Sequence, residues 1–245
     1  MYRPLLTFCF LLLSSLTQAN ETRTLRMVSN QWPPYVDSSL AEQGLAIEIV
    51  TKALQKKGYQ PTLTIDNWPR ALEGVAIGVF DATCAIWKTP EREQDLLFSE
   101  PYLKNKISFL KKKGLSIDYQ QLSDLKGFII GVLRSYAYND EFTQSRGLMK
   151  VPENYVIQNL QKLNQGAIEL TLGDELVINH ALKQYLPKQM HTFEFLSPAL
   201  AYKDLYFAVS KSNKNAQAII DDFNAALKEM QQDGSYDQII SHYQH

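Results

Sequence analysis

The stretch from Asp81 to Tyr102 constrains the fold most, because a buried strand there must end at a fixed point. Residues 82–87 are mostly apolar, as in a buried strand. Pro90 and Glu91 suit the first turn of a helix, where proline loses no hydrogen bond and an acid is favoured by the helix dipole. Arg92 then projects from that turn, where a cation beside free N–H groups can bind a carboxylate. The alternative is a surface arginine paired with a neighbouring glutamate.

The first nineteen residues have the organisation of a secretory signal peptide. Arg3 precedes an apolar run from Leu5 to Leu16, and Thr17 and Ala19 provide the small residues of a cleavage site. The apolar run is shorter than a membrane span requires. We therefore expect residues 1–19 to be removed during export and the remaining protein to be periplasmic.

The composition of the exported chain narrows its possible partners and cofactors. Loss of Arg3 leaves 24 Lys+Arg against 26 Asp+Glu, a formal charge of −2. The sequence has no basic stripe of the kind that binds nucleic acid, so we expect no nucleic-acid partner. Cys84 would be the one remaining cysteine, and its apolar surroundings predict a buried, inert thiol. The four histidines lack a metal-binding spacing, so we expect neither a metal nor another cofactor.

Four short motifs stand out along the chain: T-P-E-R at 89–92, F-S-E-P-Y at 98–102, L-S-D-L-K-G at 122–127 and D-G-S-Y-D at 233–237. Together they resemble the bacterial extracellular solute-binding proteins of family 3, the polar amino-acid receptors of ABC importers.

The resemblance extends from about residue 25 to residue 243. It implies an α/β, two-lobed periplasmic-binding-protein fold of type II, the Venus flytrap, with a hinge of two chain crossings. Residues 20–106 and 197–245 would form lobe 1, and residues 107–196 would form the inserted lobe 2.

The resemblance also assigns roles to two charged residues. Arg92 matches the arginine that holds a ligand α-carboxylate in the family. Asp174 matches the aspartate that binds the α-ammonium, at the family's spacing from Gly166. A carboxylate at this strand end could neutralise an ammonium group, although Asp174 could equally act as an N-cap for the helix that follows.

Aromatic residues are expected around the ligand. Tyr35 follows two prolines and matches a family position whose ring covers the ligand, so the resemblance favours Tyr35 over Trp32. Trp68 matches the ring on the ligand's other side. Trp87 departs from the family, which carries a hydroxyl residue there, and the run before Arg92 is one residue shorter. Ala85, two residues before Trp87, is a further candidate contact for the ligand.

Four further residues complete the predicted site. Ser135, or the backbone at Tyr136, would replace the hydroxyl-bearing helix start that completes the family's carboxylate site. Arg134 adds a cation near the cleft. Arg70 is either a solvated helix residue or a second cation that reaches an acidic group of the ligand.

We therefore expect a monomeric receptor that captures a small zwitterionic ligand, an amino acid or a relative, between its lobes. An inner-membrane ABC permease would receive the ligand. One alternative is an exported enzyme like cyclohexadienyl or arogenate dehydratase, with Asp174, Glu175 or Glu169 as the acid. Another is a receptor for a membrane signalling protein. The sequence shows no nucleophile–base pair, which favours a binding protein.

Overall fold

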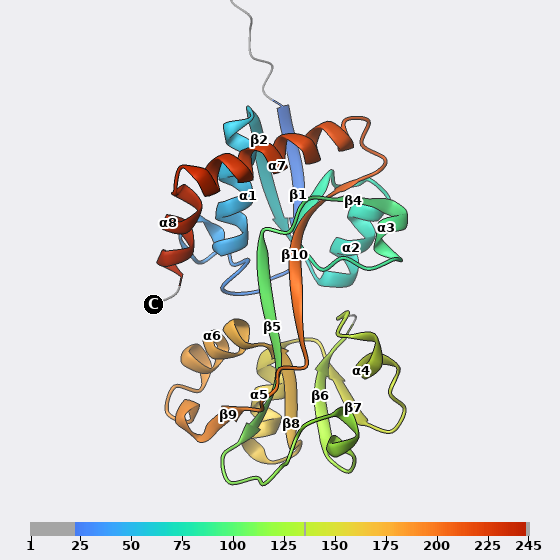
Figure 1. Cartoon of the computed structure of the whole chain (residues 1–245), viewed down its shortest axis with the longest axis vertical. Helices are drawn as coiled ribbons and strands as arrows, with labels where there is room; N and C mark the ends of the chain where they lie inside the picture. The colour runs from blue at the N-terminus through green and yellow to red at the C-terminus, as the bar shows by residue number, and fades with distance from the viewer. Residues whose placement is uncertain (1–22, 135, 244–245) are drawn as a thin grey trace, which may run out of the picture.

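The computed structural model describes residues 23–134 and 136–243, and in it two groups of strands and helices lie one above the other (Figure 1). The predicted signal peptide and Ser135 lie outside the described residues. Two long strands, β5 (Leu103–Lys112) and β10 (Ala201–Ser210), run between the two groups.

The first group, which we call the upper half, contains both ends of the described chain. Its elements are β1 (Arg23–Ser29), η1 (Ala41–Gln43), α1 (Leu45–Lys56), β2 (Tyr59–Ile65), α2 (Trp68–Ala76), β3 (Ala82–Ile86), α3 (Arg92–Asp95), β4 (Leu96–Phe98), α7 (Ala216–Gln232) and α8 (Ser235–His242).

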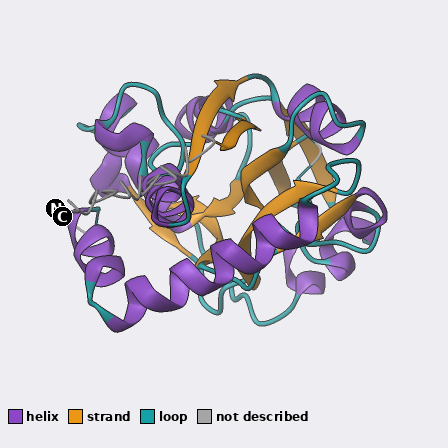
Figure 2. Cartoon of the chain, turned by 90° about the horizontal axis from the view of Figure 1, so that it is seen from above, coloured by secondary structure: helices purple, strands orange, loops and turns teal. Residues whose placement is uncertain are grey.

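The second group, the lower half, is built from the middle of the chain. Its elements are η2 (Leu122–Leu125), β6 (Ile129–Leu133), α4 (Asp140–Gln144), β7 (Met149–Glu153), α5 (Val156–Gln165), β8 (Leu170–Asp174), α6 (Glu175–Tyr185), η3 (Met190–Thr192) and β9 (Phe193–Phe195). Seen from above, helices lie around the strands (Figure 2).

Each half is built around three parallel strands. In the upper half β1 lies between β2 and β3, and in the lower half β6 lies between β7 and β8. The helices cover these strands with apolar faces: α1 buries Leu45, Ile49 and Leu54, for example. Helix α6 begins directly after Asp174, as the N-cap alternative requires.

The strands β5 and β10 pair with each other only in the middle of the molecule. Residues 103–107 of β5 pair antiparallel with residues 201–205 of β10. Beyond this ladder β5 pairs with β8 and β9, while β10 pairs with β3 and β4. The two crossings between the halves therefore form one hydrogen-bonded ribbon.

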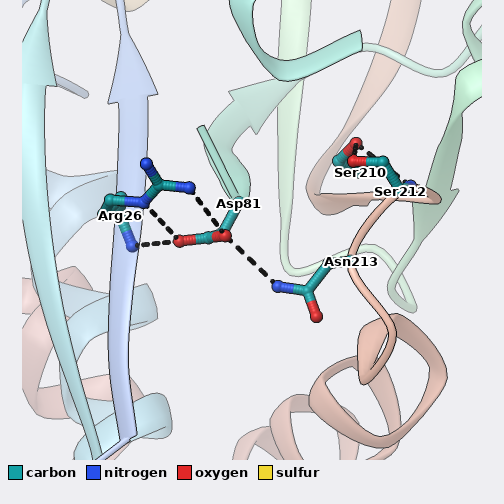
Figure 3. Close-up of polar contacts among 5 residues, drawn as sticks. All are labelled: Arg26, Asp81, Ser210, Ser212 and Asn213. Atoms are coloured by element: carbon teal, nitrogen blue, oxygen red, sulfur yellow. Dashed lines mark hydrogen bonds and ion pairs between the residues drawn. The ribbon is translucent and has the colours of Figure 1, made fainter. Parts of the chain in front are cut away.

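A polar cluster around Asp81 ties three segments of the upper half together (Figure 3). The Asp81 carboxylate accepts hydrogen bonds from the backbone N–H of Arg26 at 2.9 Å, from its Nε at 3.1 Å and from Asn213 Nδ2 at 3.3 Å. Burial alone would raise the pKa of Asp81, but these hydrogen bonds and the Arg26 charge hold it below its ordinary value.

Substitution of Asp81 by alanine is expected to lower the free energy of unfolding by about 1–3 kcal/mol at pH 7, because the Arg26 N–H loses its partner. Since the folded-state pKa is depressed, the contribution should be present at neutral pH and disappear as the pH falls through that pKa. Urea denaturation at several pH values measures it. Asp204→Ala, which removes an exposed ion pair with Lys104, is the control and should change stability little. Equal effects of both substitutions would contradict the prediction.

Candidate ligand-binding cleft

A small, partly open pocket lies where the two halves meet. Its lining comes from both halves and is mostly aromatic or apolar: Asn30, Trp32, Trp68, Ala85, Ile86, Trp87, Arg92, Tyr136 and Ala137.

The topology explains why these residues meet. The loop after β1, the end of β3 and the loop after β6 all lie at carboxyl ends of parallel strands. In open α/β sheets this edge is where ligands bind, since the loops there project away from the packed core.

Arg92 is the one charged side chain among the lining residues that the structure describes. Its Nη1 donates a hydrogen bond to the Trp87 carbonyl at 2.6 Å, and its guanidinium lies 5.3 Å from the centre of a Trp68 ring. Burial lowers the pKa of Arg92 to about 10, an effect that the Glu91 charge opposes, so the side chain remains a cation at neutral pH.

The helix expected after Pro90 is much shorter than the sequence suggests. Helix α3 has four residues, from Arg92 to Asp95, because Leu96 turns at once into β4 and pairs with β10. So short a helix has little dipole, and the attraction for an anion here comes from the Arg92 guanidinium itself.

Four aromatic side chains form a cluster that crosses the cleft. The ring of Trp32 lies 4.8 Å from Tyr35 and 5.8 Å from Trp87, all in the upper half. Tyr136, from the lower half, lies 6.4 Å from Trp32 and 5.6 Å from Trp87 with its ring nearly perpendicular to both. Such edge-to-face contacts are favourable beyond the area they bury.

Trp87 is held in place by a buried hydrogen bond. Its indole Nε1 donates to Asn105 Oδ1 of β5 at 2.7 Å. Asn105 is completely buried, and its Nδ2 has no hydrogen-bond partner of normal geometry among the described residues. Trp87 thus fills a fixed place at the position where the family carries a hydroxyl residue.

Asp174 has the position expected at a strand end, and it also caps α6. Its Oδ1 accepts hydrogen bonds from the Val177 N–H at 3.0 Å and from the Tyr35 hydroxyl at 3.2 Å. The side chain is 5% exposed, and burial raises the pKa of Asp174 to about 6 against the opposing hydrogen bonds. The N-cap alternative is confirmed, and it does not conflict with a ligand role, because an aspartate has further lone pairs.

The other predicted residues separate into two groups. Trp68, Ala85, Trp87 and Tyr136 line the pocket together with Arg92, whereas Tyr35 lies behind the lining on Asp174. Arg70 and Arg134 do not line it: Arg70 has 72% of its side chain exposed and pairs with Asp66, and Arg134 is exposed.

Some lining residues carry no signal in the sequence analysis. Asn30, Ile86 and Ala137 are ordinary in type, and Trp32 is a lining residue although the resemblance favours Tyr35. Trp32 donates its N–H to the Val36 carbonyl at 2.8 Å, which closes the proline loop and turns its ring into the cleft. An aromatic residue at the carboxyl end of β1 was the available clue.

Three further features of the described part of the chain bear on its chemistry: its thiol, its potential metal ligands and the length and apolarity of its helices. Cys84 is completely buried, and burial raises the pKa of its thiol to about 12. Residues 23–134 and 136–243 contain no group of three or more potential metal ligands and no helix with the length and apolarity to cross a membrane.

The sequence model of the bacterial extracellular solute-binding proteins, family 3, matches residues 25–245. The chain belongs to this family. Membership confirms the resemblance, and it accounts for a pocket between two halves joined by two crossings.

Individual family members resemble the chain at low identity. The L-cystine-binding protein TcyA of Bacillus subtilis is 25% identical over 197 residues, which cover 80% of this chain and 70% of TcyA. The ABC transporter arginine-binding protein 1 of Escherichia coli is 26% identical over 216 residues, or 86% of each chain.

A solved ancestral arginine-binding protein bound to arginine superimposes with a TM-score of 0.77 at 24% identity. The match covers 91% of this chain and 98% of that one. The predicted two-lobed α/β fold is thereby confirmed. The named relatives are binding proteins for amino acids, and the chain is a divergent member of that group.

Proposed function

We propose that this protein is a periplasmic receptor that captures a small zwitterion, an amino acid or a close relative, and delivers it to an ABC importer. The observation that carries the proposal is Arg92, a cation that faces an aromatic pocket and has no carboxylate within 4 Å among the described residues. A half-buried cation without a partner is favoured only if it binds an anion, and a carboxylate matches its planar fork.

Asp174 supplies the second contact in this proposal. Its carboxylate would bind the ligand ammonium, and Tyr35, which now donates to Oδ1, would give up or share that oxygen. Arg92 belongs to the upper half and Asp174 to the lower half, so one ligand would bridge them. Contacts that exist only in the closed form would then favour closure.

Closure requires that the two halves move as bodies. We propose the division at 106/107 and 196/197, with residues 20–106 and 197–245 as one lobe and 107–196 as the other. The ladder between residues 103–107 and 201–205 would be the hinge. An inner-membrane permease would recognise the closed, monomeric form. In support, the name of the Escherichia coli relative assigns that protein to an ABC transporter.

A thermal-shift screen tests the proposal. The purified protein, refolded to remove bound ligand, is combined with each of the common amino acids and with prephenate and arogenate. A true ligand at a hundred times its dissociation constant should raise the melting temperature by about 5–10 °C. A response to no amino acid would refute the proposal, and turnover of prephenate or arogenate would show an enzyme instead.

A further inference from the structure

Lys203 is a second cation beside the cleft: it does not line the pocket itself but lies over the ring of Trp87, which does. It lies on β10 within the hinge ladder, directly opposite Asn105 of β5. Residues opposite each other in an antiparallel pair project from the same face of the sheet. Asn105 contacts Trp87 on that face, and the Lys203 ammonium lies 5.5 Å from the centre of the Trp87 ring.

Lys203 and Arg92 therefore both contact Trp87. Arg92 donates to the Trp87 carbonyl, while Lys203 lies over the ring and donates to the Tyr138 carbonyl of the lower half at 3.1 Å. Within residues 23–134 and 136–243, neither cation has a carboxylate within 4 Å.

The electrostatic surroundings of Lys203 also indicate that neither cation is neutralised. Burial lowers the pKa of Lys203, and the nearby Arg92 charge lowers it further, so the two cations repel each other. Asp140 at the start of α4 opposes this with a smaller effect. Asp174, the buried acid of the cleft, is engaged by Tyr35 and Val177 and does not neutralise either cation.

We propose that Lys203 binds a second anionic group, so that the preferred ligand is an amino acid whose side chain ends in a carboxylate. This inference rests on the proposed function, in which Arg92 binds the α-carboxylate. A ligand with a cationic side chain, such as the arginine of the solved relative, would bring a third positive charge into this pocket. An acidic side chain would instead relieve the repulsion between the two cations.

Calorimetric titration with matched acid and amide pairs tests the inference. The refolded protein is titrated with L-glutamate, L-glutamine, L-aspartate, L-asparagine and L-arginine. One of the two acids should bind at least about 30-fold more tightly than its amide, because the amide leaves a desolvated ammonium unpaired. Lys203→Met should weaken binding of that acid by a similar factor and reduce the ratio of acid to amide affinity towards one.

Lys104→Met is the matched control, because Lys104 lies in the same ladder but is exposed and paired with Asp204. It should leave the acid-to-amide ratio unchanged. Arginine binding more tightly than both acids would overturn this inference and leave the proposed receptor intact. Binding of no amino acid would overturn both. The wild-type ratio alone decides the matter if Lys203→Met does not fold.

Discussion

Replacing Arg92 with alanine is expected to weaken binding of the receptor's amino acid by roughly 30-fold to several thousand-fold, the cost of removing one partner from a desolvated charge pair. The guanidinium is the one charged group among the described lining residues, so no other lining side chain can substitute for it. Arg92→Lys should recover only part of the loss, because an ammonium cannot make the two parallel hydrogen bonds of an arginine.

The same substitution should have little effect on the ligand-free protein. Alanine loses the hydrogen bond to the Trp87 carbonyl and the contact with Trp68, but it also removes a cation whose pKa burial has lowered. These effects oppose each other, and we expect a net change within about 1 kcal/mol in the free energy of unfolding.

Arg70→Ala is the matched control for Arg92→Ala. It removes the same side chain from a nearby helix, where Arg70 is exposed and paired with Asp66. Calorimetric titration should show unchanged affinity in this variant. If Arg92→Ala retained wild-type affinity, or if both variants lost it equally, the carboxylate site would lie elsewhere.

Asp174→Asn should stabilise the ligand-free protein at pH 8 while abolishing tight binding of the ligand. The buried carboxyl titrates at about pH 6 instead of its ordinary value, so its ionised form is disfavoured by up to about 3 kcal/mol at high pH. Asparagine is an equally good N-cap and can still accept hydrogen bonds from Val177 and Tyr35.

The pH dependence has a definite sign. The folded protein holds the Asp174 proton more tightly than the unfolded chain, so this group lowers stability as the pH rises from about 4 to about 6. Asp174→Asn should lack that decrease. Ligand affinity of the wild type should fall below about pH 6, because a protonated carboxyl cannot neutralise an ammonium.

Asp124→Asn provides a control of opposite sign. The backbone N–H groups of Gln120 and Gln121 hold the pKa of the exposed Asp124 below its ordinary value, so its substitution should lower stability at pH 8. Urea denaturation of both variants at pH 5 and pH 8 gives the comparison. A less stable Asp174→Asn protein at pH 8 would mean that the carboxylate serves the fold, and retained affinity would remove it from the site.

The fold could be predicted because its signals are local. Gly166 and Gly234 adopt positive φ angles at helix boundaries, a conformation that favours glycine, and the sequence motifs place them correctly. The apolar faces of α1 and α7 repeat at helical spacing and are buried as that spacing requires. Arg92 and Asp174 could be singled out as candidates because motifs place the first shortly after β3 and the second at the end of β8.

The rest of the site could not be predicted, because no local sequence pattern shows which way each side chain points. Trp32 and Tyr35 belong to one short loop, yet one lines the pocket and the other lies on Asp174. Lys203 is one of several lysines on the crossing strands, and only the register against Asn105 shows that it faces Trp87. The proposed ligand specificity of Lys203 therefore depends on tertiary packing, whereas the proposed carboxylate-binding residue, Arg92, belongs to a sequence motif.

The ribbon formed by β5 and β10 makes the motion of this molecule simple to observe. Because the two crossings are hydrogen-bonded to each other over five residue pairs, bending within the plane of the ribbon would stretch those bonds, whereas bending out of the plane preserves them. If the halves move as proposed, opening is close to a rotation about one axis. Donor and acceptor dyes at several pairs of positions, one on each half, would then give different distance changes that a single rotation angle explains, so the chain could serve as a scaffold for a fluorescent sensor.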